Sequence, residues 1–248
     1  MKPVIIIAVA VVAVVAAVVL LALFGSFSAA GMATASGNDI VLAALNRTSA
    51  ISAYIIHYNI TNFIEAGGET IQIPGDITVI HSPFGEKISI VMQVQGQDVS
   101  VDIYKLVDGT YSCENGLSGS YCQKYNDTLP VQNPIEQAES LMALAADGTV
   151  GIASQGTRNA LRPCNAVSLN YDLTKLFSKL SVSVDVSSAI TEMSASICFD
   201  RETGLPLEYE QVISMTAETA LTSRMRMTAT QLELTAPDIA LPEGAVIY

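Results

Sequence analysis

Hydrophobic and polar residues alternate with a period close to two along most of the chain, which is typical of β-strands. At residues 193–199 the apolar side chains point one way, while Ser194, Ser196 and Cys198 point the other. The same alternation occurs at residues 88–94, 99–103, 167–171, 182–186, 205–215 and 225–229. A change of phase to Leu232 and Leu234 predicts a β-bulge near Gln231. We expect nine to eleven antiparallel strands, each with one buried and one wet face.

Three segments break this pattern with helical spacing. They cover residues 39–47, residues 134–146 after Asn133, and residues 173–180 after Asp172. Because each strand buries only one face, the sheet needs a cover, either a second layer as in a sandwich or the helices themselves. Helices of this length favour the second arrangement. The predicted fold class is mainly β (α+β), a curved, part-open antiparallel β-barrel with a helical lid.

The chain begins with an apolar run at residues 4–24 that contains no polar or charged side chain. As a helix it would be about 31 Å long, close to the roughly 30 Å hydrocarbon core of a bilayer. A cleaved secretory signal has an apolar core of only about 7–15 residues, so an uncleaved anchor is favoured. Lys2 is the only basic residue before Arg47, which places the N-terminus in the cytoplasm and the rest outside.

These features predict three parts along the chain. Residues 1–24 form an N-terminal transmembrane signal-anchor, and residues 25–37, rich in Gly, Ser and Ala, form a flexible linker. Residues 38–248 form an extracytoplasmic β domain. The expected location is therefore the cell membrane, with a single pass and the domain outside.

Cysteine usage also indicates export. The four cysteines, Cys113, Cys122, Cys164 and Cys198, all follow the apolar run, and an even number outside a membrane suggests two disulfides. Of the three possible pairings we favour Cys113–Cys122 and Cys164–Cys198. Compact zinc motifs are missing, so no metal site is expected. Three triplets are N-glycosylation acceptors, at Asn46, Asn59 and Asn126.

Composition and motifs argue against several functions. The formal net charge of −12 repels nucleic acid and anionic headgroups, which excludes nucleic-acid binding as a main role. The two histidines, His57 in a predicted strand and His81 before a turn, provide no evident base for a nucleophile. The segment at residues 116–120 lacks the final glycine of a nucleophile elbow. No nucleotide or calcium motif is present, so we expect neither catalysis nor a cofactor.

The candidate binding residues are apolar side chains at inward positions, many of them flexible, polarisable methionines. They are Met92, Ile103, Met142, Phe177, Tyr209, Met215, Met225 and Met227. The alternative is that these side chains simply fill the core. If they form a binding surface, the expected partner is a lipid or a lipid-modified protein, besides the membrane that holds the anchor. A second hypothesis, based on the glycosylation triplets, the disulfides and the acidic wet face, is a cell-surface structural or adhesive glycoprotein.

Three short stretches resemble the bacterial outer-membrane lipoprotein carrier superfamily, the LolA/LolB-like fold. They are residues 39–60 after the linker, "FDRETGLPLEYE" at residues 199–210, and "LTAPDIALPEGAVI" at residues 234–247. The resemblance implies a curved, unclosed barrel whose concave apolar face holds acyl chains beneath helices, here in an archaeal-type, membrane-anchored member. The arginine that locks the lid of that family has no counterpart, because the equivalent strand offers only His57 and Asn59.

Overall fold

The computed structural model describes residues 36–94, 96–116, 119–125, 134–180, 190–216, 220–235 and 237–247. Within these ranges the chain forms three helices and one twelve-stranded sheet. The helices are α2 (Ser36–Thr48), α3 (Pro134–Ala146) and α4 (Leu173–Leu180). The first six strands are β1 (Tyr54–Ala66), β2 (Glu69–Ser82), β3 (Gly85–Val94), β4 (Gln97–Leu106), β5 (Gly109–Gly116) and β6 (Gly119–Tyr125). The others are β7 (Val150–Asn159), β8 (Pro163–Tyr171), β9 (Ile190–Asp200), β10 (Pro206–Thr216), β11 (Ala220–Glu233) and β12 (Val246–Ile247).

The sheet consists of two meanders, β1 to β6 and β7 to β11. They are joined where β1, the first strand of one, pairs with β11, the last strand of the other. The order of the sheet is β12-β6-β5-β4-β3-β2-β1-β11-β10-β9-β8-β7, so β1 and β11 meet in the middle although they are far apart in sequence. Neighbouring strands are antiparallel except β12, a two-residue strand that runs parallel to β6. Because β7 and β12 lie at opposite edges, the sheet stays open. The prediction of a mainly β, part-open antiparallel structure with three helices is confirmed, whereas the described residues form twelve strands rather than the expected nine to eleven.

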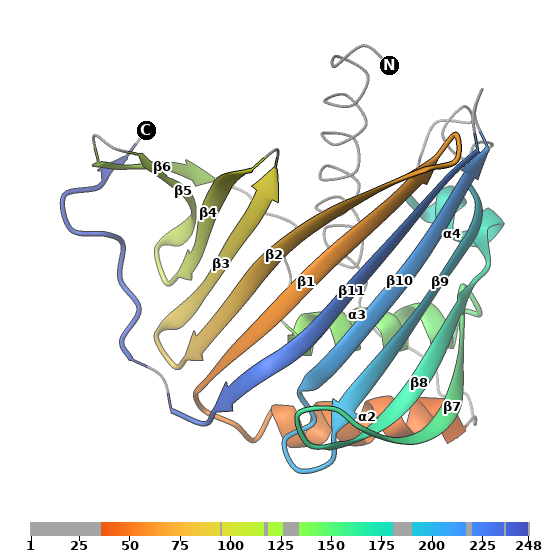
Figure 1. Ribbon diagram of the computed structural model, residues 1–248. Helices are drawn as coiled ribbons and strands as arrows, with labels where there is room; N and C mark the ends of the chain where they lie inside the picture. The colour runs from red at the N-terminus through yellow and green to blue at the C-terminus, as the bar shows by residue number, and fades with distance from the viewer. Residues whose placement is uncertain are drawn as a thin grey trace.

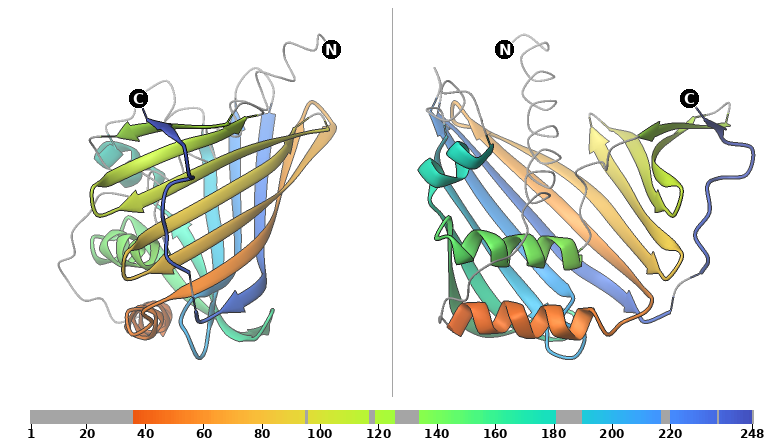
Figure 2. Two further views of the ribbon diagram at one scale, coloured as in Figure 1. Left: turned by 90° about the vertical axis from the view of Figure 1, so that its left-hand side faces the viewer. Right: turned by 180° about the vertical axis from the view of Figure 1, so that it is seen from behind.

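The helices lie on one side of the curved sheet, which we call the inner face (Figures 1 and 2). Val41 of α2, Leu144 of α3 and Leu176 of α4 are buried in one cluster with side chains of β7 to β10, such as Leu169 and Ile197. A second cluster contains inward residues of β1 to β4 and β11, together with Cys164, Ala166, Cys198, Leu205 and Leu207 near the β9–β10 turn. The helices therefore cover the β7 to β10 half of the inner face.

The predicted bulge lies on β11 and is confirmed. Tyr58 pairs with Ala229 whereas His57 pairs with Gln231, which leaves Thr230 as the extra residue. Its hydroxyl donates to the His57 carbonyl oxygen at 3.2 Å. The extra residue changes the phase of β11, so that Leu232 returns to the inner face opposite Ile56.

The "DRETGLPL" segment forms the turn between β9 and β10 and fixes the end of α2. Buried Asp200 accepts a 2.6 Å hydrogen bond from the Thr203 hydroxyl. Gly204 has a φ of 75°, and a Cβ there would lie 2.1 Å from the Ala44 carbonyl oxygen. The Thr48 hydroxyl donates to the Thr203 carbonyl oxygen at 3.1 Å. Only glycine allows this close contact between helix and turn.

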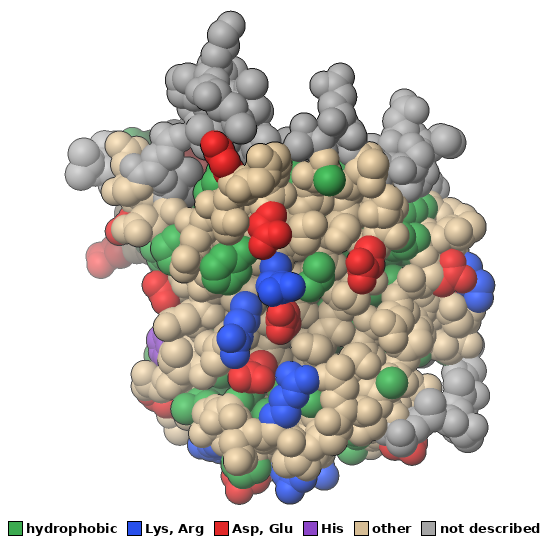
Figure 3. All heavy atoms as spheres, turned by 45° about the vertical axis from the view of Figure 1, so that its right-hand side comes forward, with side chains coloured by type: hydrophobic (Ala, Val, Ile, Leu, Met, Phe, Trp, Pro, Cys, Tyr) green, Lys and Arg blue, Asp and Glu red, His purple; other side chains and the backbone are tan. Residues whose placement is uncertain are grey.

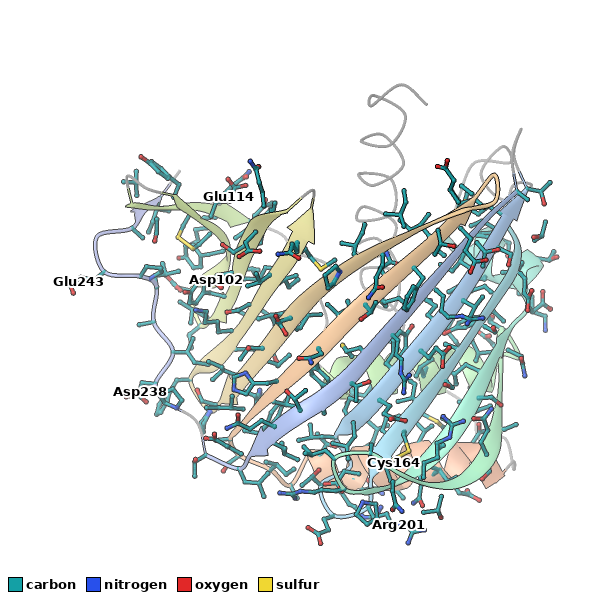
Figure 4. The ribbon with its side chains drawn as sticks, viewed as in Figure 1. Asp102, Glu114, Cys164, Arg201, Asp238 and Glu243 are labelled. Carbon is teal, nitrogen blue, oxygen red and sulfur yellow. A yellow bond between two sulfur atoms is a disulfide. The ribbon has the colours of Figure 1, made fainter. Side chains whose placement is uncertain are left out.

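Both predicted disulfides are present. Cys113 and Cys122 face each other on β5 and β6, and Cys164 on β8 is bonded to Cys198 on β9. The first bond is buried in a small cluster against the C-terminal segment that leads to β12. Figure 4 shows Asp238 and Glu243 on this segment, along the outer edge of the sheet.

The outer face of β10 and β11 carries charged side chains in pairs, as the alternation predicted. Arg224 Nε lies 3.8 Å from Glu210 Oε1, and Arg226 Nη2 lies 4.0 Å from Glu208 Oε1. Figure 3 shows acidic and basic side chains intermixed on the surface of the molecule. Exposed pairs of this kind contribute little to stability.

Several predicted features lie outside the described residues. They are the signal-anchor, most of the linker, the strand at residues 182–186 and the acceptor Asn126. Within the described part of the chain, no helix is both long enough and apolar enough to cross a bilayer.

Candidate functional site

A row of inward residues crosses most of the sheet. From β8 to β4 its members are Val167, Ile197, Tyr209, Met227, Ile60, Gly75, Met92 and Val99, each paired with the next. Side chains in the row are buried at the helix-covered end and become more exposed toward β4, where Val99 is 53% exposed. Ile90 and Val101, in the neighbouring row, are half-buried. This row of the inner face is thus apolar, and the face is partly open over β3 and β4.

The structure places most of the candidate binding residues on or against this face. Met92, Ile103, Met225 and Met227 belong to the cluster of β1 to β4 and β11. Met142 and Met215 contact the cluster under the helices. Tyr209 contacts both clusters and so joins the two halves of the inner face.

Phe177 is the exception among the candidates. It is half-buried on α4 but belongs to none of the four apolar clusters of the described residues, and Leu173 and Leu176 make the contacts of this helix with the core. The binding role of all eight residues stays a prediction.

Three polar side chains interrupt the apolar inner face on β1, β10 and β11. Asn62 and Gln211 are 2% and 3% exposed and lie on either side of Met225 in one cross-strand row. The Ser223 hydroxyl donates to Asn62 Oδ1 at 3.1 Å. Gln211 Nε2 is buried and has no hydrogen-bond partner in the described structure. Such a group is unusual, because a buried unpaired donor loses its hydration without compensation.

Burial also affects the tyrosines of the inner face. It raises the pKa of Tyr209 and of Tyr58 far above the ordinary value for a phenol. Burial raises the pKa of Tyr171 as well, and the charge of nearby Tyr209 adds to the effect. The Tyr58 hydroxyl donates to the Pro206 carbonyl oxygen at 2.8 Å. These phenols therefore present neutral groups to the interior.

Three ionisable side chains, His81, Glu86 and Lys105, form a row at one end of the inner face, which we call the ion row. Glu86 on β3 lies between His81 on β2 and Lys105 on β4, with its carboxylate oxygens 3.7 Å from His81 Nδ1 and 3.4 Å from Lys105 Nζ. The Tyr54 ring stacks on the His81 ring with centroids 5.1 Å apart. Because the carboxylate is buried between two basic groups, this end of the face is polar.

The two histidines lie on opposite faces of the sheet. His57 Nδ1 shares a 2.9 Å hydrogen bond with the Thr78 hydroxyl on the outer face, whereas His81 belongs to the ion row. Of the three glycosylation acceptors, Asn46 is exposed on α2 and Asn59 is exposed on the outer face of β1. Glycosylation stays a prediction.

Sequence reasoning missed the polar residues of the inner face. Gln211 lies in phase between Tyr209 and Ile213, Glu86 is in phase with Ile88, and Lys105 is in phase with Ile103. The same alternation could therefore have identified these polar residues, because they occupy inward positions of their strands.

No family model matches the chain, and no match to a curated protein was found. Among solved structures, it is similar to a DUF1329 family protein from Desulfovibrio piger, at 9% identity and a TM-score of 0.31, covering 84% of this chain and 94% of the other. It is also similar to an outer membrane lipoprotein-sorting protein domain from Vibrio parahaemolyticus, at 9% identity and a TM-score of 0.30. This match covers 79% of this chain and 91% of the other.

A LolA superfamily protein from Nitrosomonas europaea gives 9% identity, a TM-score of 0.29, and coverage of 84% of this chain and 96% of the other. With TM-scores near 0.3, these similarities carry no argument of their own, and the LolA/LolB-like fold stays what the sequence resemblance implies.

Proposed function

We propose that the protein is a membrane-anchored, extracytoplasmic domain that binds a lipid or another apolar ligand on its inner face without catalysis. The observation that carries this proposal is that the apolar side chains of the inner face become more exposed to solvent from β8 toward β4. The helices pack on β7 to β10, whereas Ile90, Met92 and Val101 on β3 and β4 stay partly exposed.

Binding in this geometry uses the hydrophobic effect. An acyl chain laid against β3 and β4 would remove both its own surface and these side chains from water. The gain is about 25 cal/mol for each Å² of apolar surface that is buried. Methionines such as Met92 and Met227 suit a ligand of variable shape, because their side chains are flexible and polarisable.

Two further features support the location and the absence of catalysis. The apolar run at residues 4–24 is long enough for an anchor, and two disulfides favour an oxidising compartment. The inner face presents neutral tyrosines, and its histidine is held in the ion row with Glu86.

The absence of tryptophan from the chain allows a direct test. A single tryptophan is introduced into the full-length chain as I90W on the inner face or as V91W at the adjacent outer position. Each variant is reconstituted in phosphatidylcholine vesicles with and without bromine atoms in the middle of the acyl chains. Bromine quenches tryptophan fluorescence only at short range. We expect strong quenching of the I90W variant by the brominated lipid and little quenching of the V91W variant.

The V91W variant is the matched control, because Ile90 and Val91 are neighbouring, half-buried aliphatic residues of β3. Equal quenching at the two positions would show general contact with the bilayer, and no quenching at Ile90 would show an interior closed to lipid. Either result contradicts the proposal. Near-ultraviolet circular dichroism of both variants checks that the fold is retained.

A further inference from the structure

The unpaired amide of Gln211 lies at a defined place on the inner face. Gln211 pairs with Ala195 on one side and with Met225 on the other, and beyond Met225 lies Asn62. The rows before and after it contain mainly apolar side chains, including Tyr209 and Ile213 on the same strand. The donor Nε2 is therefore held in apolar surroundings with no partner in the described structure.

Such a group has an energetic consequence. An amide N–H that leaves water without a new acceptor loses the free energy of its hydration, whereas an apolar side chain of similar shape avoids this loss. A core that served packing alone would be more stable with Leu or Met at this position. The position is well suited to an amide only when an acceptor is present.

The surroundings restrict the kind of acceptor. The described inward positions of β1, β9, β10 and β11 include no Lys or Arg that could neutralise an anion. The hydroxyl of Ser223 is already used toward Asn62. An uncharged oxygen fits this environment, and a carboxylate or a phosphate does not.

We propose that Gln211 donates a hydrogen bond to a carbonyl oxygen of an acyl ester or amide, so that the ligand is an acyl lipid rather than a hydrocarbon. This inference rests on the proposed function. Four strand spacings separate β10 from β3, or about 19 Å at about 4.8 Å each. A long acyl chain held by its carbonyl at Gln211 therefore reaches toward the partly exposed residues Ile90 and Met92.

The test uses the full-length I90W reporter in unlabelled phosphatidylcholine vesicles. Two probes of equal chain length are added, the methyl ester of dibromostearic acid and a dibromooctadecane, each brominated in the middle of the chain. The change Gln211→Met removes the donor and keeps an unbranched side chain of similar length. We expect the half-quenching concentration of the ester to rise about three- to tenfold, as for loss of one neutral hydrogen bond. That of the alkane is expected to stay the same or to fall.

The control is Gln72→Met, which removes an exposed amide from the outer face of β2. It should leave the quenching by both probes unchanged. An equal effect of Gln211→Met on ester and alkane, or no effect on the ester, would overturn the carbonyl site while leaving apolar binding intact. If neither probe quenches the reporter with Gln211 in place, the proposed function fails instead. Thermal unfolding of the Q211M variant shows whether its fold is retained, and Gln211→Leu repeats the test with a second apolar side chain.

Discussion

The sulfur of Met92 lies 2.6 Å from the point that a Cβ atom on Gly75 would occupy. The two residues face each other across β2 and β3, and they form the last pair between these strands in the direction of the β1–β2 turn. Pro74 lies next to Gly75 on the side of the β1–β2 turn, where β2 no longer pairs with β3 and pairs only with β1. Proline has no N–H donor, so it suits a position without this second partner strand. The Pro-Gly step therefore lets β2 separate from β3 while Met92 fills the space above the glycine.

The change Gly75→Ala is expected to destabilise the protein by about 1–3 kcal/mol, as for other overpacked interiors. The added methyl would meet the flexible side chain of Met92 and also the Val91 carbonyl oxygen, which is 2.4 Å away and belongs to the backbone. Gly151→Ala is the control, because its nearest neighbour is at an ordinary 3.8 Å. Urea unfolding followed by circular dichroism measures both. Equal stability of the two variants would show that β2 and β3 adjust without cost.

The change Tyr58→Phe tests the link between the middle of the sheet and the β9–β10 turn. The buried hydroxyl donates to the Pro206 carbonyl oxygen, and its loss leaves that oxygen without this partner. We expect the free energy of unfolding to fall by about 1–3 kcal/mol. Tyr125→Phe removes an exposed hydrogen bond to Gln123 and should have almost no effect. A Tyr58→Phe variant as stable as the parent would show that the carbonyl finds another donor.

The two disulfides should differ in their contribution to stability. Cys164 and Cys198 are 34 residues apart, whereas Cys113 and Cys122 are 9 apart. In the chain-entropy model these loops correspond to about 4 and about 2.5 kcal/mol. Because all four side chains are buried, replacing either pair by alanine creates a similar packing defect. Denaturant midpoints of the two double variants should therefore be lower for the Cys164–Cys198 pair, and the opposite order would contradict the entropic argument.

The alternation of the sequence determined which face each residue occupies, and the structure agrees along the strands. It placed Tyr209, Met225 and Met227 on the inner face and located the bulge near Gln231 from the change of phase alone. These features are local, because side-chain direction depends only on position along a strand.

Strand neighbours that are distant in sequence could not be predicted in this way. Alternation says which face of β1 is buried, but it contains no information that β11 pairs with it. The same limit applied to the ion row, because Glu86 and Lys105 become partners only through the register of β3 and β4. Gln211 was overlooked because apolar residues alone were counted at inward positions.

Burial of tyrosines makes a prediction for alkaline pH. The pKa of Tyr209 is raised by burial above the roughly 10 of an exposed phenol, so above pH 10 the unfolded chain loses a proton that the folded chain keeps. The contribution of this residue to stability is therefore complete below about pH 10 and declines as the pH rises toward the folded pKa.

Tyrosinate absorbance should show a group of phenols that ionise only on unfolding, among them Tyr209 and Tyr58. In the Tyr209→Phe variant the free energy of unfolding should decrease less between pH 9 and pH 11 than in the parent. If all tyrosines of the folded protein ionise together near pH 10, the interior is accessible to hydroxide and the inner face is far wetter than its burial indicates.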